Sequence, residues 1–302
     1  MAPELKNVGA SVRARLLDLA RKEGSDFQIL LTRYALERLL YRLSLSGERE
    51  RFVLKGAMLF ITWLTDPFRP TRDLDLLGQG DPDVDAITTR FRGIFGTDVP
   101  DDGVIFDIAG MLVESIRDQA DYGGVRVRTS ASIAGAKVPI QIDIGFGDAI
   151  TPGPIDIDYP ALLDAPSPRL KAYPPETVVA EKFEALVSIG ISNSRMKDFY
   201  DLWMIAQTFQ FDREMLSTAL RRTFERRNTP WPPKNPTGLT DAFAFEKDRM
   251  WHAFLKRERL GAAPEDMSRV VVDLRAFLGP VIEDDLNYER WQPGGPWLRT
   301  TE

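Results

Sequence analysis

The sequence predicts an α+β fold in two parts, in which a sheet-bearing part is followed by a mainly helical part. Three observations lead to this prediction. The first fifty residues have the apolar spacing of helices, three β-like runs follow between residues 104 and 146, and helical patterns return beyond a proline- and glycine-rich stretch at 152–175. We therefore expect a first domain over residues 1–165 and a second, helical domain over residues 166–302.

Two helices are expected at the N-terminal end of the chain. A first apolar face lies within residues 12–20, and a longer one lies within residues 27–43. Ser25 or Asp26 is a suitable N-cap for the second helix, because a short polar side chain can accept hydrogen bonds from the first free N–H groups. The apolar run 52–63 that follows opens with a strand or a helix.

A polar loop then caps a helix around residues 86–94, and three β-like runs come after it. Residues 104–117 contain Gly110, where the run bends or splits. Residues 125–133 and 138–146 alternate between apolar and polar side chains, as half-exposed strands do. The turn signals between them are Gly123-Gly124 and Gly135-Ala136-Lys137. This pattern predicts an antiparallel meander.

Two helices, over residues 177–190 and 195–206, open the second half of the chain. Residues 228–238, rich in proline and asparagine, indicate a loop between later helices. The tail from Pro293 is expected to be poorly ordered, because it is short and contains adjacent glycines.

Composition limits the chemistry available to these 302 residues. The chain has no cysteine and a single histidine, His252, which excludes disulfides, thiolate metal sites, cysteine nucleophiles and multi-histidine metal sites. Carboxylate, lysine, arginine and hydroxyl chemistry is left. No apolar run approaches the roughly 18–20 residues of a membrane span, and the N-terminal residues lack a signal-peptide pattern. We expect a cytoplasmic protein without a membrane partner.

Asp73 and Asp75 end a strand-like run and are separated by Leu74. Residues two apart on a strand point to the same face, so the two carboxylates should lie side by side. Two like charges that close repel each other unless a proton or a cation lies between them. A divalent ion, Mg²⁺ or Mn²⁺, suits the pair because it prefers oxygen ligands and also holds substrate phosphates. The alternative is a strand that ends in two solvated acids.

Asp143 lies on the polar side of the run 138–146 and would add a third carboxylate. A two-metal phosphoryl-transfer site needs such a set, because one ion activates the attacking oxygen and the other steadies the leaving pyrophosphate. Gly56 precedes the pair, where a glycine lets backbone N–H groups approach a phosphate. Asp156 and Asp158 repeat the spacing in a proline-rich, loop-like context, so we place them outside the site.

Lys182 shares a helical face with Val178 and Ala185, where a lysine is costly unless it meets an anion. Asp198 and Asp201 are three residues apart and share a face of the next helix. One interpretation is a salt bridge that joins the two helices. The other is a nucleotide site in which Lys182 holds the triphosphate and one aspartate orients the lysine or acts as a base. The three carboxylates elsewhere in the chain favour the second interpretation.

A formal net charge of −6 argues against a nucleic-acid partner, whereas local basic clusters argue for one. Composition alone does not decide between them. The basic residues that we expect to contact an RNA backbone are Arg221, Arg222, Arg226 and Arg227.

Four motifs in order resemble those of a known family. Gly56 and the segment Arg69-Pro70-Thr71-Arg72-Asp73-Leu74-Asp75 are similar to the G[GS]…R-x-[ST]-x-D-h-D signature of the AbiEii nucleotidyltransferase toxins, which include MenT-like toxins. These toxins belong to the DNA polymerase β-type nucleotidyltransferase superfamily. Residues 142–145, 181–184 and 195–202 resemble the second, third and fourth motifs, and the likeness covers about residues 10–280. One departure is Ala57, where the superfamily often has glycine or serine, so only backbone donors could contact a phosphate there.

The resemblance implies a bilobed α+β fold, with a nucleotidyltransferase lobe, a helical lobe and the active site between them. It also implies Mg²⁺-dependent transfer of a nucleoside monophosphate from an NTP co-substrate to an RNA acceptor, the 3′ end of tRNA, which blocks translation. A cognate antitoxin protein is the implied partner. Two alternatives stay open: a different acceptor, namely an antibiotic-like small molecule or a protein hydroxyl, and a non-catalytic nucleotide- or partner-binding module.

The resemblance and the residue patterns together assign the expected roles. Asp73 and Asp75 bind the metal ions, and Asp143 completes the metal site or acts as a base toward the attacking hydroxyl. Lys182 holds NTP phosphate, and Asp198 orients Lys182 or assists catalysis. The further residues expected at the nucleotide are Gly56, Ala57, Arg69 and Thr71.

Overall fold

The computed structural model describes residues 7–64, 71–117 and 123–300 of the chain. Arg69, one of the residues expected at the nucleotide, lies outside these ranges.

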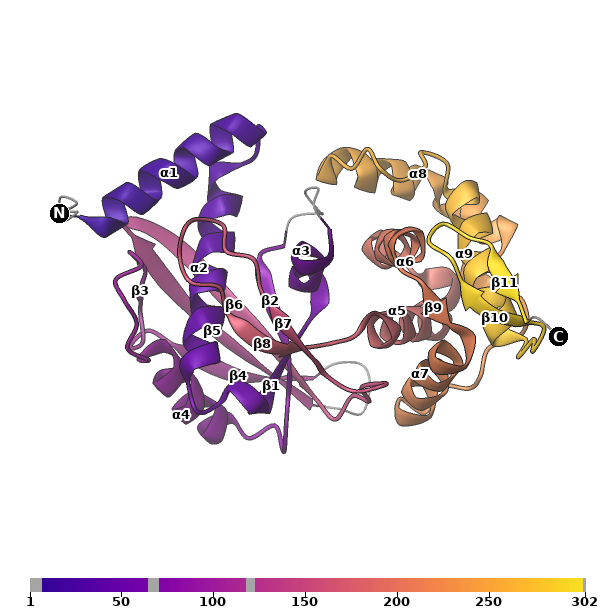
Figure 1. Cartoon of the computed structure of the whole chain (residues 1–302), viewed down its shortest axis with the longest axis horizontal. Coiled ribbons are helices and arrows are strands. Elements are labelled where there is room, and N and C mark those ends of the chain that lie inside the picture. The colour runs from indigo at the N-terminus through magenta and orange to yellow at the C-terminus, as the bar shows by residue number, and fades with distance from the viewer. Residues whose placement is uncertain (1–6, 65–70, 118–122, 301–302) are drawn as a thin grey trace. The chain divides into compact units, whose positions relative to one another are not determined.

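The chain divides into two compact units (Figure 1). The first unit consists of Met1–Gly147 and Ile155–Ala172, and the second consists of Asp148–Pro154 and Tyr173–Glu302. The last crossing of the chain from one unit to the other therefore follows residue 172, beyond the division expected at residue 165.

The first unit is built on an eight-stranded sheet of mixed direction. The strand order is β3-β5-β6-β2-β1-β8-β7, and β4 also pairs with β5. β2 is parallel to β6 and β1 is parallel to β8, whereas the remaining pairs in this sheet are antiparallel. The strands are β1 (Phe52–Lys55), β2 (Asp73–Gly78), β3 (Ile105–Phe106), β4 (Leu112–Arg117), β5 (Gly123–Ile133), β6 (Ala136–Phe146), β7 (Ile155–Asp158) and β8 (Arg169–Ala172).

One face of this sheet is apolar because every second residue of its central strands is aliphatic. Leu74, Leu76, Ile142 and Ile144 are at most 1% exposed. Burying each such side chain stabilises the fold by about 1.5–3 kcal/mol, and a slip of one residue would move all of them to the other face. The register of β2 and β6 is therefore strongly specified, and their polar residues are fixed on the opposite face.

Three helices pack on the apolar face, α1 (Val8–Glu23), α2 (Phe27–Leu45) and α4 (Val84–Phe95). Phe91 of α4 meets Phe52 of β1 edge to face, with ring centroids 5.4 Å apart. The short η2 (Gly56–Leu59) and α3 (Phe60–Trp63) follow β1 directly.

Several boundaries predicted from the sequence are confirmed. The Asp26 side chain caps α2 by accepting hydrogen bonds from Gln28 N and Ile29 N. The run 52–63 opens with a strand, and the run 104–117 splits into β3 and β4 around Gly110. The turn between β5 and β6 lies earlier than predicted, at Ala134-Gly135, where both residues have positive φ as a type I′ hairpin requires.

The second unit is mainly helical, as predicted. Its helices are α5 (Pro175–Ile189), η3 (Gly190–Ser192), α6 (Met196–Thr208), α7 (Arg213–Arg226), η4 (Thr237–Leu239), α8 (Asp241–Glu258) and α9 (Met267–Ile282). A three-stranded sheet formed by β9 (Phe211–Asp212), β10 (Tyr288–Trp291) and β11 (Trp297–Arg299) accompanies them.

Two local predictions are wrong. The tail is ordered from residue 293 to residue 300, because β11 pairs with β10 and the indole of Trp297 donates a hydrogen bond to Phe277 O at 2.9 Å. Asp156 and Asp158 lie on strand β7 and not in a loop, because this edge strand pairs with β8. Prolines beside a strand are compatible with an edge position, where a ladder hydrogen bond is not needed on one side.

Candidate functional site

The structure brings three predicted carboxylates together on the polar face of the sheet. Asp73 and Asp75 lie at the start of β2, whereas we predicted them at the end of a strand. The parallel pairing with β6 sets Asp75 opposite Asp143 and Asp73 opposite Gln141. Neighbouring strands are about 4.8 Å apart, so the two carboxylates at matching positions are near neighbours. All of these side chains are partly exposed. Alternation along one strand and register between two strands therefore produce the cluster that the sequence predicts.

Gly56 lies against this cluster at the end of β1. Its φ is +73°, a conformation that glycine adopts without strain, and a Cβ at this position would overlap the carboxylate of Asp75. Ala57 is 6% exposed, so its side chain belongs to the core. The Thr71 hydroxyl donates a hydrogen bond to Asp73 O at 3.1 Å, which fixes the start of β2.

A guanidinium that the sequence did not lead us to expect holds the third carboxylate. Arg126 of β5 lies opposite Asp143, and its Nε and Nη2 donate to the two carboxylate oxygens at 2.6 and 2.7 Å. The hydrogen bond to Asp143 is the largest cause of a raised Arg126 pKa, and the charges of Asp73 and Glu114 also favour the guanidinium. Arg126 thus belongs to the carboxylate cluster.

The hairpin geometry explains why this contact exists. Ile133 pairs with Ala136 across the two-residue turn, and counting seven positions outward along each strand brings Arg126 opposite Asp143. An alternating strand and a located turn would therefore have revealed Arg126 in the sequence. We predicted the turn too late, which left this register undetermined.

The cluster belongs to a row of charged residues that crosses the sheet. Glu114, Arg126, Asp143, Asp75 and Lys55 occupy matching positions on β4, β5, β6, β2 and β1. The two neighbouring acids lie at the centre of this row, with a basic residue beyond each of them. Opposite charges at matching positions stabilise a sheet, whereas the like-charged central pair favours a site for a cation.

The residues fit a divalent cation in part. Asp73 and Asp75 offer carboxylate oxygens from one face of one strand, which suits Mg²⁺ or Mn²⁺. Both oxygens of Asp143 are bonded to Arg126. Within residues 7–64, 71–117 and 123–300, no three acidic or histidine side chains already surround a common cation position. Each Asp143 oxygen accepts one hydrogen bond from Arg126 and keeps a second lone pair, so an ion at the other two carboxylates would share Asp143 with the guanidinium or displace it.

The second unit carries the predicted lysine–aspartate cluster. Lys182 of α5 reaches Asp198 Oδ1 at 2.9 Å and Asp201 Oδ2 at 2.6 Å, both on α6. Arg195 Nε lies 2.6 Å from Asp198 Oδ2. Burial alone would raise the pKa of Asp198, but the charges of Lys182 and Arg195 outweigh it, and the net shift is downward. The contacts are those of the salt-bridge interpretation, and they also suit an aspartate that orients a lysine.

The four arginines suggested for RNA contacts differ in their surroundings. Arg222 is exposed, and Arg221 stacks on the Trp231 ring at 4.5 Å. Arg226 is partly buried. Arg227 is enclosed by carboxylates, with Asp148 at 3.2 Å, Glu181 at 3.4 Å and Glu184 at 2.8 Å. Arg227 is thus committed to this network within the second unit.

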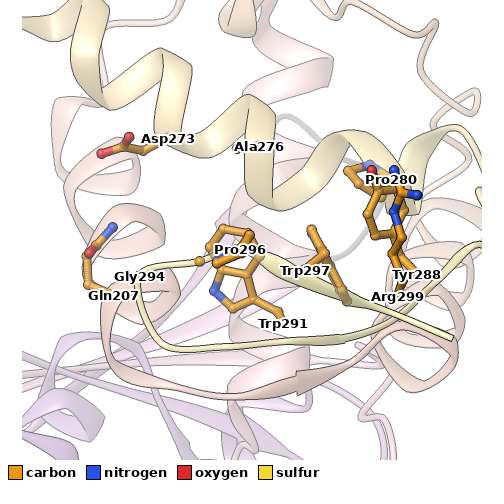
Figure 2. A pocket seen from close by; sticks show the side chains of 11 residues that line it. Gln207, Asp273, Ala276, Pro280, Tyr288, Trp291, Gly294, Pro296, Trp297 and Arg299 are labelled. Atoms are coloured by element: carbon orange, nitrogen blue, oxygen red, sulfur yellow. The ribbon is translucent and has the colours of Figure 1, made fainter. Parts of the chain in front are cut away.

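A pocket of about 680 Å³ lies in the second unit, beside the β10–β11 hairpin (Figure 2). Trp291 and Trp297 form part of its wall, and their indole N–H groups donate to Ala206 O and Phe277 O. Asp273 and Arg299 add one charge of each sign. The residues that line this pocket include none of the predicted site residues.

Comparison with models of known protein families identifies the family to which this chain belongs. Residues 38–273 match the nucleotidyl transferase AbiEii toxin of a type IV toxin–antitoxin system, and the match spans more than half of the chain. The chain belongs to the AbiEii family. This finding confirms the resemblance inferred from the four sequence motifs.

Two solved structures from Helicobacter pylori share the fold of this AbiEii chain. One is JHP933 and the other is described as a nucleotidyltransferase. Each is 14% identical to this chain and covers 86% of it, and the matches cover 95% and 98% of the two proteins, with TM-scores of 0.51 and 0.50. At this identity the likeness concerns the fold alone. No curated protein matches the sequence.

Family membership also bears on partners. An AbiEii toxin is one half of a toxin–antitoxin pair, so an antitoxin belongs with this chain. Among the described helices of this AbiEii protein, none is long and apolar enough to cross a bilayer.

Proposed function

We propose that this AbiEii chain transfers a nucleoside monophosphate from an NTP to an RNA acceptor, the 3′ end of tRNA, in a Mg²⁺-dependent reaction of the nucleotidyltransferase class. The observation that carries the proposal is the register of β2 and β6, which sets Asp75 opposite Asp143 with Asp73 two residues away on the same face. Membership of the AbiEii family supports the reaction class. Modification of the tRNA acceptor end would block aminoacylation and so translation.

The proposed roles follow from the positions of the side chains. Asp73 and Asp75 hold the metal ions, and Asp143 acts as the third ligand or accepts the proton of the attacking hydroxyl. Bound Mg²⁺ would supply charge stabilisation for the attacking oxygen and the leaving pyrophosphate. Gly56 and Ala57 contribute backbone N–H groups toward phosphate, because the absent side chain of Gly56 leaves room beside Asp75. Thr71 positions Asp73 through its carbonyl oxygen.

Lys182 is the proposed phosphate ligand, and Asp198 is the group that orients it. The 2.9 Å contact between Lys182 Nζ and Asp198 Oδ1 supports the orienting role. Arg69, which the structure does not describe, stays a predicted phosphate contact. The cognate antitoxin is the protein partner, and the cytoplasm is the compartment where tRNA and NTP meet.

The proposal is tested by incubating the purified protein with total tRNA, Mg²⁺ and each α-³²P-labelled NTP in turn, followed by a denaturing gel. We expect label on tRNA from one or more nucleotides. Asp73→Asn should lower the labelling at least about 1,000-fold with the fold unchanged by circular dichroism, because neutralising a carboxylate ligand removes most of the charge that holds the ion.

Asp156→Asn is the matched control. Asp156, on edge strand β7, belongs to a pair with the same Asp-x-Asp spacing, but it forms ion pairs with Arg49 and Lys171. The variant should label tRNA within about threefold of the wild type. Equal labelling by Asp73→Asn would overturn the assignment. Label on a protein or small molecule, with none on RNA, would retain the chemistry and replace the acceptor.

A further inference from the structure

The ion pair between Arg126 and Asp143 occupies a carboxylate that the proposed reaction needs. Both oxygens of Asp143 accept from one guanidinium, in the side-on bidentate geometry that is strongest for this pair. The side chains are 26% and 23% exposed, so water reaches both partners. A partly hydrated ion pair can open without leaving a charge buried, which a fully buried pair cannot do.

The carboxylates of Asp143 and Asp75 each lie toward the outer neighbour of their own strand, and not toward each other's strand. Asp143 is bonded to Arg126 on one flanking strand, β5, whereas the Asp75 carboxylate lies against Gly56 beside the other, β1. Gln141 Nε2 adds a long contact of 3.4 Å to Asp143 Oδ2. A metal ion shared by Asp75 and Asp143 would compete with Arg126 for the negative charge and the orientation of the Asp143 carboxylate.

We propose that Arg126 is a positioning residue that holds Asp143 in the metal-free protein and yields it to the catalytic divalent ion, so that the guanidinium and the metal compete for one carboxylate. The inference rests on the proposed function, since it assumes a metal at Asp73 and Asp75. It explains why the three carboxylates are neighbours and yet do not already form a cation cage. Metal affinity in the absence of nucleotide is thereby kept below what three free carboxylates would give.

The neighbouring cation Arg128 provides a matched control. It lies two residues along β5 on the same face, but it pairs with Glu114 at 2.6 Å and contacts Gln141 Oε1 at 3.4 Å. Removing Arg128 therefore takes one positive charge from the same surface without freeing Asp143.

The experiment measures Mn²⁺ binding to the whole chain without nucleotide, by electron paramagnetic resonance of the free ion. Arg126→Gln should bind Mn²⁺ about tenfold more tightly than the wild type, since it loses a charge-assisted competitor. Arg128→Gln should change the affinity less than about threefold. Arg126→Lys, which keeps the charge but not the bidentate geometry, should lie between the wild type and Arg126→Gln. Circular dichroism of each variant confirms the fold.

A double variant decides whether Arg126 acts through Asp143. In an Asp143→Asn background, Arg126→Gln should tighten Mn²⁺ binding less than about threefold, because the shared carboxylate is gone and only the longer-range repulsion by the guanidinium charge is removed. Equal affinities of wild type and Arg126→Gln, or the same tightening in the Asp143→Asn background, would overturn this inference alone. Absence of Mn²⁺ binding in both the wild type and Arg126→Gln, or binding that survives Asp73→Asn, would overturn the proposed metal-dependent function as well.

Discussion

The two units contain the same chemical pattern, a pair of aspartates beside a basic side chain, in different surroundings. On the sheet, Arg126 and Asp143 are each about a quarter exposed. On the helices, Asp198 and Asp201 are 1% and 0% exposed, and Lys182 is 13% exposed. A charge that water reaches can exchange its partner, whereas a buried charge that loses its partner pays a large desolvation penalty. The sheet cluster can therefore change its contacts during a reaction, and the helix cluster is suited to holding α5 against α6.

This difference predicts two kinds of mutant. Substitutions in the sheet cluster should remove activity and leave the fold intact. Substitutions in the helix cluster should lower stability first, and any loss of activity must be separated from that effect.

The largest stability effect is expected for Lys182→Met. The change removes the cation that Asp198 and Asp201 share and leaves both carboxylates of α6 buried without it. Removing one partner of a buried ion pair costs about 3–5 kcal/mol. Urea unfolding followed by circular dichroism measures the loss.

Lys247→Met is the control for this experiment. Lys247 is similarly buried at 12% exposure and lies in the same unit, but its partner Glu246 is 54% exposed. Its removal should cost less than about 1 kcal/mol. A Lys182→Met protein as stable as the wild type but inactive in tRNA labelling would show that Lys182 serves the nucleotide and is not needed to hold the helices.

The face of the sheet on which the three aspartates lie was predictable because it follows from local rules. Asp73, Asp75 and Asp143 occupy polar positions in alternating runs, and a buried aliphatic face fixes which way those positions point. The lysine–aspartate contact was also visible, since Lys182 lies on an apolar helical face. In both cases the residues of one element indicate the charge that a neighbouring group must have.

The features that escaped prediction depend on which segments pair and in which register. Arg126 joins Asp143 only when the hairpin turn is placed at Ala134-Gly135, and our prediction of a later turn did not fix that register. The order of the C-terminal tail depends on Trp297 packing between β10 and α9, which a glycine- and proline-rich segment does not reveal. Strand β7 exists because β8 supplies its hydrogen bonds. The residues around 155–158 do not indicate that residues 169–172 will pair with them.

A smaller effect is expected for Gly56→Ala, which tests the sheet cluster without changing its charge. Alanine at this position would have to adopt the positive φ of Gly56, and its Cβ would overlap the Asp75 carboxylate. We expect a loss of about 1–3 kcal/mol in the free energy of unfolding. Transfer should fall at least about tenfold, because a displaced carboxylate no longer meets the metal in the required geometry. Urea unfolding and tRNA labelling measure the two effects.

Gly24→Ala separates strain from displacement. Gly24 has a φ of +64° at the end of α1, and an added Cβ there meets nothing within 4 Å. It should cost about 1–2 kcal/mol through backbone strain and leave transfer unchanged. If both variants keep full activity, the position of Asp75 is not critical and the two clusters differ less than their burial indicates.

The smallest expected effect is the change in the free energy of unfolding at acid pH, which tests the helix cluster directly. The pKa of Asp198 is lowered in the folded protein, because the charges of Lys182 and Arg195 outweigh the effect of burial. An unfolded aspartate has a pKa of about 3.9, so the ionised contact contributes its full stability above that pH. The contribution is lost as the pH falls through the lower, folded-state value. The wild type should therefore lose more stability between pH 5 and pH 3, roughly the window set by that reference value, than Asp198→Asn does.

Urea midpoints of both proteins at the two pH values measure this difference, and each protein serves as its own reference for the destabilisation that the substitution causes by itself. A steeper acid loss in the wild type would mean that the lysine–aspartate contact is a net stabilising ion pair of the helical unit. Parallel losses would mean that the charges of Lys182 and Arg195 gain little from Asp198 in the folded chain. The cluster would then resemble the one on the sheet, with a lysine held in place and available to a phosphate, and burial alone would no longer separate the roles of the two units.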